Sequence, residues 1–410
     1  MRFCHVSTFY PPWNFGGDGI AIQMICEALA RRGHQVDVVH CADAYGLRGR
    51  QAVSAAIDPP GVHRHTLHSR LGALSPIITQ QTGRPGLKHD RISEILSNSY
   101  DVVHFHNISL VGGPGVMALS QAPVTLYTTH DHWLVCPAHV LWKNKSKPCD
   151  KPSCFSCSIR SGFPPQMWRY TGLLQRSLRH VDALLCPSDF AAQRHRSAGI
   201  NCDIHVHRWF SRMGSAPRDT EETPTESATD SAPLFVYAGR LVVSKGVEHL
   251  LEVFAQRPEY RLDVAGDGPL RGVLQSRYEG FPQIRFLGET AGPELERLFR
   301  RARAVVVPSW GPEVSPLTVL EALACGAPVI VRRAGGSAEA VELAGGGLIY
   351  ERPEELLPLV DRLAKDAALN KTLSIQAELG SSEHFSEEIW MKRYFSIIEQ
   401  IAHDKSAVLE

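Results

Sequence analysis

Short apolar runs alternate with segments in which apolar residues recur every three or four positions, most clearly in the second half of the chain. Runs of four or five apolar residues have the length and continuity of buried parallel strands. We expect such strands at Leu234–Ala238, Arg261–Ala265, Ile284–Leu287, Ala304–Val307 and Pro328–Val331. Helical spacing lies between them, at about 246–254, 269–277 and 293–301. Strands that alternate with helices predict an α/β domain on a parallel sheet.

The first half of the chain shows the same alternation. Arg2–Ser7 and Val36–His40 are strand-like and flank a Pro- and Gly-rich loop and a helical segment that stops at Gly33, which together make a βαβ unit. Residues 41–90 have no regular pattern. Three further strands are expected, at Asp101–His106, Val124–Thr129 and Ala183–Pro187, and a helix opens at Ser188.

A chain of 410 residues is too long for one ordinary core, so two domains are expected. We place the first at 1–208 and the second at 234–385. Residues 209–233, rich in Ser, Thr, Pro and acidic residues, read as a solvated linker. A C-terminal helix at about 386–404, with Ser386 as its cap, is expected to pack back on the first domain. A ligand cleft between the two domains is also expected.

Composition is that of a globular protein, with 43% hydrophobic and 21% charged residues. No apolar run approaches the roughly 20 residues of a membrane helix, and the N-terminus lacks a signal-peptide pattern. We therefore expect a cytoplasmic protein. Residues 1–200 hold 20 Lys and Arg against 12 Asp and Glu, and the remainder holds 23 against 31. The basic half favours an anionic acceptor or the inner membrane surface, although scattered surface charge is an equally good interpretation.

Two carboxylates eight residues apart, Glu313 and Glu321, follow the strand at Ala304–Val307. One lies in a loop at the strand's carboxyl end and the other in the following helix. In open α/β sheets ligands bind in the crevice at these ends. Ordinary solvated glutamates are the alternative. The flanking strands and the helix start make a shared ligand site the better interpretation.

The helix between the two carboxylates has marked ends. Ser315 suits an N-cap, Pro316 the first helical position, and Gly326 the position after the last turn. The N–H groups of Leu317 and Thr318 would then form an anion site. A phosphate at the helix tip, with hydroxyl groups held by carboxylates, describes a nucleotide sugar.

Two cations, Arg240 and Lys245, follow the strand at Leu234–Ala238 and suit a diphosphate. Gly266 and Gly268 follow the next strand in a G-x-G-x-x-x-G sequence related to the dinucleotide fingerprint. This keeps an NAD(P)-dependent oxidoreductase as an alternative. The simpler interpretation is a tight turn beside the base or ribose of the donor.

In the first domain, Gly16 and Gly17 open a helix and let the backbone approach a ligand closely. His130 and Asp131 end a strand, so His130 would face the sugar and Asp131 the acceptor. His104 and His106 share one face of a strand, because side chains alternate there. They are candidates for metal ligands, but an acceptor-side position is the better interpretation, above all for His106.

Four cysteines form a C-x12-C-x4-C-x2-C cluster in a Lys- and Pro-rich loop: Cys136, Cys149, Cys154 and Cys157. In a cytosolic chain this spacing favours structural zinc over disulfides. An iron–sulfur cluster and free thiols remain alternatives. Four thiolates leave no open coordination position, so a catalytic metal is not expected.

The chain resembles the retaining glycosyltransferases of family 4, which have the GT-B architecture of two Rossmann-like domains facing a deep cleft. The resemblance rests on Glu313-Val-Ser-Pro-Leu317 and Leu320–Ile330, which carry an E-x7-E pattern, and on the Gly239-Arg-Leu, Lys245-Gly, Gly266-Asp-Gly-Pro and His130-Asp131 motifs. The four-cysteine insertion resembles one branch of the family. His205–Phe210 departs from it, since the usual Pro-Asn-Gly is missing.

The resemblance implies transfer of a sugar from a UDP- or GDP-sugar to a hydroxyl acceptor, with retention at the anomeric carbon. Glu313 would contact the donor sugar, Glu321 the ribose, and Arg240 with Lys245 the diphosphate. The acceptor would be a glycan, a lipid-linked sugar or a small glycoside. No cofactor is expected for transfer, and no nucleic acid partner. A non-catalytic nucleotide-sugar-binding subunit is the remaining alternative.

Overall fold

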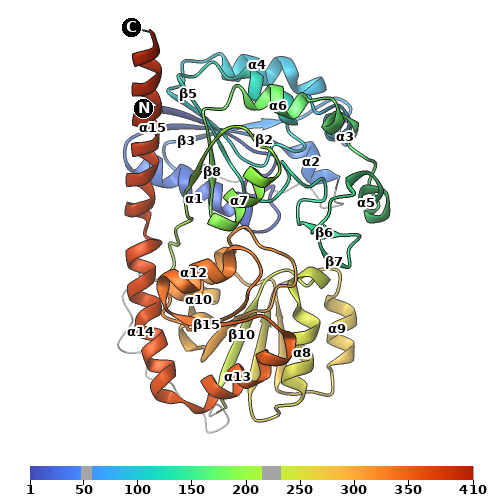
Figure 1. Ribbon diagram of the computed structural model, residues 1–410, viewed down its shortest axis with the longest axis vertical. Helices are drawn as coiled ribbons and strands as arrows, with labels where there is room; N and C mark the ends of the chain where they lie inside the picture. The colour runs from blue at the N-terminus through green and yellow to red at the C-terminus, as the bar shows by residue number, and fades with distance from the viewer. Residues whose placement is uncertain (48–57, 215–231, 410) are drawn as a thin grey trace. The chain divides into compact units, whose positions relative to one another are not determined.

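The computed structural model describes residues 1–47, 58–214 and 232–409, which divide into two compact units (Figure 1). Unit 1 comprises Met1–Asn144, Cys149–Arg208 and Met391–Glu410, and unit 2 comprises Lys145–Pro148 and Trp209–Trp390. The limits predicted for the two domains stay predictions, and most of the predicted linker, residues 215–231, lies outside the described residues.

Unit 1 is built on a seven-stranded parallel sheet with the order β3-β2-β1-β4-β5-β8-β9. Its inner strands are buried on both faces, which explains their continuous apolar character. The strands are β1 (Arg2–Val6), β2 (Gln35–Cys41), β3 (Val62–Leu67), β4 (Val102–Phe105), β5 (Val124–Thr128), β8 (Ala183–Cys186) and β9 (Asp203–Val206). The short strands β6 (Trp142–Lys143) and β7 (Lys147–Pro148) belong to unit 1 and unit 2, respectively.

Helices connect the strands of unit 1. The first, α1, buries its apolar stripe and ends before Gly33, which has a left-handed φ of 82°. Ser188 caps α7 as predicted, since its hydroxyl accepts a hydrogen bond from the Ala191 N–H. The α-helices are α1 (Gly17–Arg31), α2 (Ala42–Gly46), α3 (Leu74–Thr82), α4 (His89–Leu96), α5 (Cys154–Ser161), α6 (Leu173–Leu178) and α7 (Asp189–Ser197), and the 3₁₀ turns are η1 (Gly86–Lys88), η2 (Pro114–Leu119) and η3 (Met167–Tyr170).

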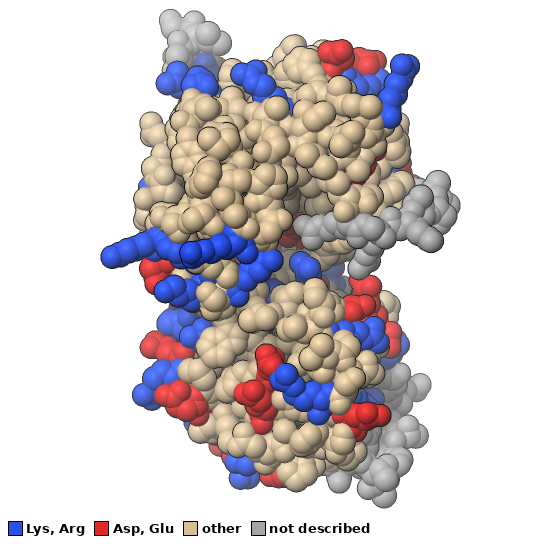
Figure 2. Space-filling model, turned by 90° about the vertical axis from the view of Figure 1, so that its right-hand side faces the viewer, with Lys and Arg blue, Asp and Glu red and all other residues tan. Residues whose placement is uncertain are grey.

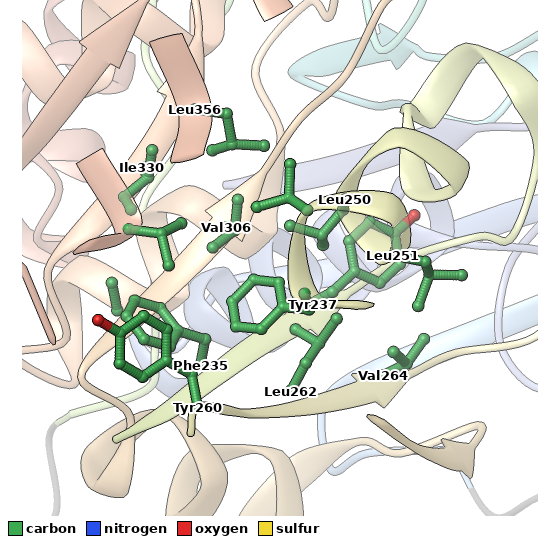
Figure 3. Close-up of a cluster of buried hydrophobic side chains, with 14 of the residues drawn as sticks. Phe235, Tyr237, Leu250, Leu251, Tyr260, Leu262, Val264, Val306, Ile330 and Leu356 are labelled. Atoms are coloured by element: carbon green, nitrogen blue, oxygen red, sulfur yellow. The ribbon is translucent and has the colours of Figure 1, made fainter. Parts of the chain in front are cut away.

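Unit 2 is built on a six-stranded parallel sheet with the order β12-β11-β10-β13-β14-β15. Figure 3 shows the core on one face, where Phe235 and Leu262 of the sheet meet Leu250 of α8 and Leu356 of α13. The strands are β10 (Leu234–Ala238), β11 (Arg261–Ala265), β12 (Ile284–Gly288), β13 (Ala304–Val307), β14 (Val329–Arg332) and β15 (Gly347–Tyr350). The helices are η4 (Val243–Lys245), α8 (Val247–Ala255), α9 (Arg271–Arg277), α10 (Gly292–Arg301), α11 (Leu317–Ala324), α12 (Gly336–Ala344), η5 (Pro353–Glu355), α13 (Leu356–Lys365) and α14 (Ala367–His384).

The last helix, α15 (Glu387–Leu409), begins after Ser386 as predicted, and the Ser386 hydroxyl accepts a long hydrogen bond from the Ile389 N–H. Its residues from Met391 onward belong to unit 1. The Tyr394 hydroxyl lies 2.9 Å from Nδ1 of His104, and the Lys405 ammonium donates to Asp182. These contacts lie within unit 1.

The strands predicted for unit 2 agree with the structure to within a residue or two at each end. Residues 41–90 gave no pattern, yet their described part contains α2, β3, α3 and the start of α4. The strand β3 was missed because it lies at the edge of the sheet and carries four consecutive polar residues, His63–Thr66, in place of an apolar run. Among the described residues, no helix is long and apolar enough to cross a membrane.

Candidate functional site

Two loops of unit 2 lie against each other at the carboxyl ends of β10 and β13. The backbone N–H groups of Trp310 and Gly311 both donate to the Ser244 carbonyl, at 2.9 Å each. Gly246 has a φ of 71°, and a Cβ there would lie 2.1 Å from the Pro308 carbonyl oxygen. Only glycine fits this approach. The contact fixes the loop that carries Lys245 beside the loop that carries Glu313.

Glu313 and Lys245 form an ion pair. The Lys245 ammonium lies 2.5 Å from Oε1 of Glu313, and the Ser309 hydroxyl donates to the same oxygen at 2.6 Å. The side chains are 31% and 17% exposed, so both stay accessible. The structure thus joins a predicted sugar contact and a predicted diphosphate contact in one cluster.

The backbone of Glu313 is held on its other side by the loop before α12. Its N–H donates to Ala334 at 3.2 Å, and its carbonyl accepts the Gly336 N–H at 2.8 Å. A Cβ at Gly335 would lie 2.1 Å from the Glu313 carbonyl oxygen, so glycine is needed there as well. The Glu313 carboxylate is therefore carried by a rigid backbone.

The helix α11 begins at Leu317, with Pro316 as its N-cap in an extended conformation, φ −73° and ψ 122°. The prediction of Ser315 as N-cap and Pro316 as the first helical residue was wrong by one position, because proline's fixed φ also suits the extended cap. The N–H groups of Leu317 and Thr318 begin the first turn as expected. Gly326, with a φ of 70°, follows the helix as predicted.

Glu321 lies one turn into α11. Burial raises the pKa of its carboxyl group to about 7, so at neutral pH the group is only partly ionised. The start of the same helix is tied to β10, since the Thr318 hydroxyl donates to the Ala238 carbonyl at 3.3 Å. A half-buried carboxyl in this position suits hydrogen bonds with ligand hydroxyl groups.

Arg240 is exposed just after β10, and two glycines support its loop. The Leu241 N–H donates to the Asp267 carbonyl at 2.9 Å. A Cβ at Gly266 would lie 2.0 Å from the Gly239 carbonyl, and one at Gly268 would lie 2.6 Å from the Leu241 carbonyl. In the structure these two glycines allow the loops after β10 and β11 to stack directly.

In unit 1, three carboxyl-end loops meet at one amide. The Asn107 side chain lies 3.4 Å from both Asp18, at the start of α1, and Asp131, after β5. Gly16, with a φ of 75°, turns the chain into α1, whose first residue is Gly17. The glycine loop and the His130-Asp131 segment are therefore close neighbours, as the shared sheet edge predicts.

Asp131 has both oxygens occupied. Oδ1 accepts the Trp133 N–H at 2.7 Å, and Oδ2 lies 2.6 Å from the His139 ring. Burial alone would raise the pKa of Asp131, but the charge and hydrogen bond of His139 outweigh it and lower the pKa. The carboxylate is therefore ionised at neutral pH.

Behind Asp131 lies a row of buried histidines. Nδ1 of His5 is 2.8 Å from Nε2 of His106, and Nδ1 of His106 is 2.8 Å from Nε2 of His130. Burial lowers the pKa of His5 to about 3 and that of His130 to about 4, and it lowers the pKa of His106 well below its usual value. The row is therefore neutral at pH 7. His106 is completely buried, so its position is behind His130 and not at the surface.

Nitrogen atoms of His5, His104 and His106 lie close enough for a metal ion, within 4.8 Å of one another. Both nitrogens of His104 already have partners, in Tyr394 and Thr128, and both nitrogens of His106 are used by the row. Hydrogen bonds therefore occupy the ring nitrogens of this cluster except Nε2 of His5, which is buried without a hydrogen-bond partner.

The four cysteines of the insertion are free thiols, and in the described part of the chain no three of their sulfurs lie within 4.8 Å of one another. Cys136 and Cys157 are buried, and the Asn144 N–H donates to Sγ of Cys157 at 3.3 Å. Burial raises the pKa of Cys136, Cys149 and Cys154.

Four residues of these sites were not predicted: Ser309, Asn107, His139 and His5. Asn107 is the second residue after β4, so the rule that ligands gather at carboxyl ends of strands would have found it. His5 lies inside a strand, and only its register opposite His104 brings it to the row. The loop fold that brings His139 to Asp131 leaves no local sequence signal.

Comparison with known families matches the chain in two parts. The model "Glycosyltransferase Family 4" matches residues 15–208, and the model "Glycosyl transferases group 1" matches residues 219–379. The two matches together support a GT-B glycosyltransferase that is similar to family 4. The matches cover both units, and the E-x7-E segment falls within the second.

Named relatives are distant from this glycosyltransferase. Sulfoquinovosyl transferase SQD2 of Arabidopsis thaliana is 29% identical over 60% of this chain, but the match spans only 45% of that protein. An uncharacterised glycosyltransferase of Methanocaldococcus jannaschii is 22% identical over 94% of this chain and 95% of its own length. A GDP-mannose-dependent alpha-mannosyltransferase of Mycolicibacterium smegmatis is 26% identical over 86% of this chain and 84% of its own length.

Solved structures confirm the fold. Sucrose-phosphate synthase from Thermosynechococcus elongatus superposes with a TM-score of 0.71 at 18% identity, over 98% of both chains. HepE of Anabaena, in complex with UDP-glucose, superposes with a TM-score of 0.67 at 18% identity, over 99% of this chain and 100% of that one. The predicted GT-B fold of two Rossmann-like domains is therefore confirmed.

Proposed function

We propose that this glycosyltransferase moves a sugar from a UDP- or GDP-sugar to a hydroxyl acceptor, with retention at the anomeric carbon. The observation that carries the proposal is the cluster of Lys245, Glu313 and the start of α11, with Glu321 one turn further on. Names of similar proteins support the donor class, since one is GDP-mannose-dependent and another was solved with UDP-glucose.

In this proposal unit 2 binds the donor. Arg240, Lys245 and the N–H groups of Leu317 and Thr318 stabilise the diphosphate, where negative charge grows as the glycosidic bond breaks. Gly266 and Gly268 let the Arg240 loop sit directly on the loop after β11. These groups do the work that a divalent metal does elsewhere, so we propose no metal for the transfer step.

The two carboxyl groups have different roles. Glu313 pairs with Lys245 and accepts hydrogen bonds from hydroxyl groups of the donor sugar. Glu321, with its raised pKa of about 7, contacts the ribose. A ribose offers two adjacent hydroxyl donors, and these favour the ionised form of Glu321.

Unit 1 supplies the acceptor-side residues. His130 is neutral and contacts the transferred sugar, while Asp131 contacts the acceptor. His106 acts through His130: when His106 donates to Nε2 of His130, the other nitrogen of His130 must carry its proton and can donate outward. Both oxygens of Asp131 already accept hydrogen bonds, so we favour front-face attack, with the leaving phosphate as base, over an enzyme nucleophile.

The acceptor is a hydroxyl of a glycan, a lipid-linked sugar or a small glycoside. Figure 2 views the side that carries α5 and β6 and shows Lys and Arg side chains gathered there. A basic surface favours an anionic acceptor or the cytoplasmic face of a membrane.

The donor class is tested by thermal unfolding with a panel of UDP-, GDP- and ADP-sugars. A ligand at about 100 times its dissociation constant adds roughly 2.7 kcal/mol, which raises the unfolding temperature measurably. The sugar that stabilises the protein is then supplied in excess, and the anomeric configuration of the hydrolysis or transfer product is read by NMR. Stabilisation by no nucleotide sugar, with NAD(P)H binding instead, contradicts the proposal.

We also propose that Cys136, Cys149, Cys154 and Cys157 bind structural zinc once the loop closes around the ion. The N–H that donates to Cys157 is of the kind that stabilises metal-bound thiolates. Protein purified from medium containing zinc should carry close to one zinc per chain, and Cys154→Ser should lose it. The matched control is Cys202→Ser, outside the insertion. Metal analysis that finds none, with all four thiols titrating freely, contradicts the proposal.

A further inference from the structure

Three side chains converge on the outer strands of the unit 1 sheet: Asp37 on β2, and His63 and His65 on β3. Parallel pairing places Asp37 opposite His63 and Val39 opposite His65. Because side chains alternate along a strand, His63 and His65 share one face, and Asp37 lies on that face beside them. Asp37 and His63 lie near the amino ends of their strands, whereas the candidate substrate residues follow the carboxyl ends. The cluster is therefore separate from the proposed transferase site.

The three potential ligand atoms form a nearly equilateral triangle. Oδ1 of Asp37 lies 3.1 Å from Nδ1 of His63 and 3.2 Å from Nε2 of His65, and the two nitrogens lie 3.2 Å apart. Metal–ligand bonds of about 2.1 Å at angles of 90–109° give ligand spacings of about 3.0–3.4 Å. All three edges fall in that range, as expected for three ligands on one face of a coordination sphere.

Hydrogen bonds alone account poorly for this triangle. If both histidines donate to the one carboxylate oxygen, their protons crowd together on the same side of it. If one histidine donates to the other, the acceptor ring turns an unprotonated nitrogen toward the carboxylate. A cation at the apex satisfies all three lone pairs at once. The buried cluster of His5, His104 and His106 differs, because both nitrogens of His104 and Nδ1 of His106 pair with side chains outside the cluster.

The surroundings of the cluster also suit a metal. The Tyr100 hydroxyl donates to Oδ2 of Asp37 at 2.7 Å, which orients the carboxylate from behind as outer partners do in metal sites. The Asp37 and His65 side chains are 20% and 16% exposed, whereas His63 is 71% exposed. The rigid side of the triangle is thus formed by the sheet, and its open side faces solvent.

We propose that Asp37, His63 and His65 bind one divalent first-row transition ion, with the remaining coordination positions open to water. Two imidazoles and one carboxylate suit Zn²⁺, Fe²⁺, Co²⁺ or Ni²⁺, and discriminate against Mg²⁺ and Ca²⁺, which prefer oxygen ligands. The ion would link the edge strand β3 to β2. Its open positions distinguish it from the four-thiolate zinc site, which has none.

The test is calorimetric titration of tag-free protein with Ni²⁺, supported by the visible spectrum of the Co²⁺ complex. In the Cys154→Ser variant, which removes the cysteine loop as a competing site, one site of micromolar affinity is expected, with a spectrum free of thiolate charge transfer. His63→Ala, which changes an exposed side chain, should weaken Ni²⁺ binding at least tenfold, and so should His65→Ala. The matched control is His68→Ala, since His68 is 67% exposed and faces the single carboxylate of Asp43 at 3.9 Å. Mg²⁺ should not compete.

Equal Ni²⁺ affinity in wild type and His63→Ala overturns the proposal, as does binding that requires millimolar ion. Ni²⁺ and Co²⁺ binding that is kept in His63→Ala and lost altogether in Cys154→Ser also overturns it, because the cysteine loop then accounts for all the bound ion. If His65→Ala fails to fold by circular dichroism, Asp37→Asn takes its place. None of these outcomes depends on transferase activity, so they are independent of the proposed function.

Discussion

The two units bury titratable groups of opposite kind at corresponding edges of their sheets. Unit 1 holds neutral histidines, with the pKa of His5 lowered to about 3 and that of His130 to about 4. Unit 2 holds Glu321, with its pKa raised to about 7. Burial causes all three shifts, since it disfavours the charged form of each group. At neutral pH, unit 1 thus holds neutral histidines and unit 2 holds a glutamate that is about half ionised.

Because the pKa shifts are in opposite directions, the stability of the two units should depend on pH with opposite sign. A histidine whose folded pKa lies below its unfolded value of about 6.5 makes the protein less stable as pH falls from about 6.5 toward 4. A glutamate whose folded pKa lies above its unfolded value of about 4.5 favours folding below about 4.5, and that contribution is lost as pH rises to about 7. Lowering the pH therefore destabilises unit 1 through its buried histidines, whereas it removes the destabilising effect of the ionised Glu321 in unit 2.

The largest expected effect is loss of unit 1 in mild acid. Each unit of pKa difference corresponds to about 1.4 kcal/mol, and several histidines titrate together. Hydrogen exchange at pH 7.5 and pH 5, corrected for intrinsic rates, should show protection falling far more in β4 and β5 than in β13 and α11. Unit 2 serves as the control within the same molecule. Equal loss in both units would show that the buried histidines do not set the acid limit.

Next in size is the diphosphate contact of unit 2. Lys245→Ala and Arg240→Ala should each lower turnover by about 10²–10³-fold, because each removes a charge that stabilises the leaving group. Lys371→Ala, an exposed lysine on α14, is the matched control and should leave turnover unchanged. Near-normal turnover in both test variants would remove the diphosphate assignment and leave the Lys245–Glu313 pair as a structural contact.

The smallest effect sharpens the comparison at Glu321. Nucleoside diphosphate should bind several-fold more tightly at pH 8 than at pH 6, because the ionised carboxylate accepts both ribose hydroxyls. Glu321→Gln should lose most of this pH dependence. Any change of affinity with pH that remains in this variant comes from titration of the ligand itself. Calorimetry in two buffers of different ionisation enthalpy should show proton release on binding to the wild type. If the affinity of Glu321→Gln for nucleoside diphosphate depended on pH as strongly as that of the wild type, the ribose would not bind at Glu321.

Much of unit 2 could be predicted because its inner strands are buried on both faces and therefore form continuous apolar runs, such as Ala304–Val307. The capping error at Ser315 arose because proline fits two adjacent positions of a helix start. Less of unit 1 could be predicted from the sequence. Its strand β3 carries consecutive polar residues in place of an apolar run. Two of them, His63 and His65, are ligands of the proposed metal site.

Contacts between distant segments explain what the sequence could not predict about the sites. Glu313, Lys245 and Glu321 follow strands, so the carboxyl-edge rule brought them together. The His5–His106–His130 row depends on strand register, since β1 pairs β4, and the His139 contact with Asp131 depends on the path of an irregular loop. Neither is encoded in local spacing.

The central claim, that unit 2 binds a nucleotide sugar with Glu313 on the sugar and Glu321 on the ribose, is tested most directly by one set of calorimetric titrations. Wild type, Glu313→Gln and Glu321→Gln are titrated with the nucleoside diphosphate and with the intact donor. Glu313→Gln should keep nucleoside-diphosphate affinity within a few-fold and lose the gain that the sugar adds, whereas Glu321→Gln should weaken both ligands. Loss of nucleoside-diphosphate binding in Glu313→Gln as severe as in Glu321→Gln would contradict the account.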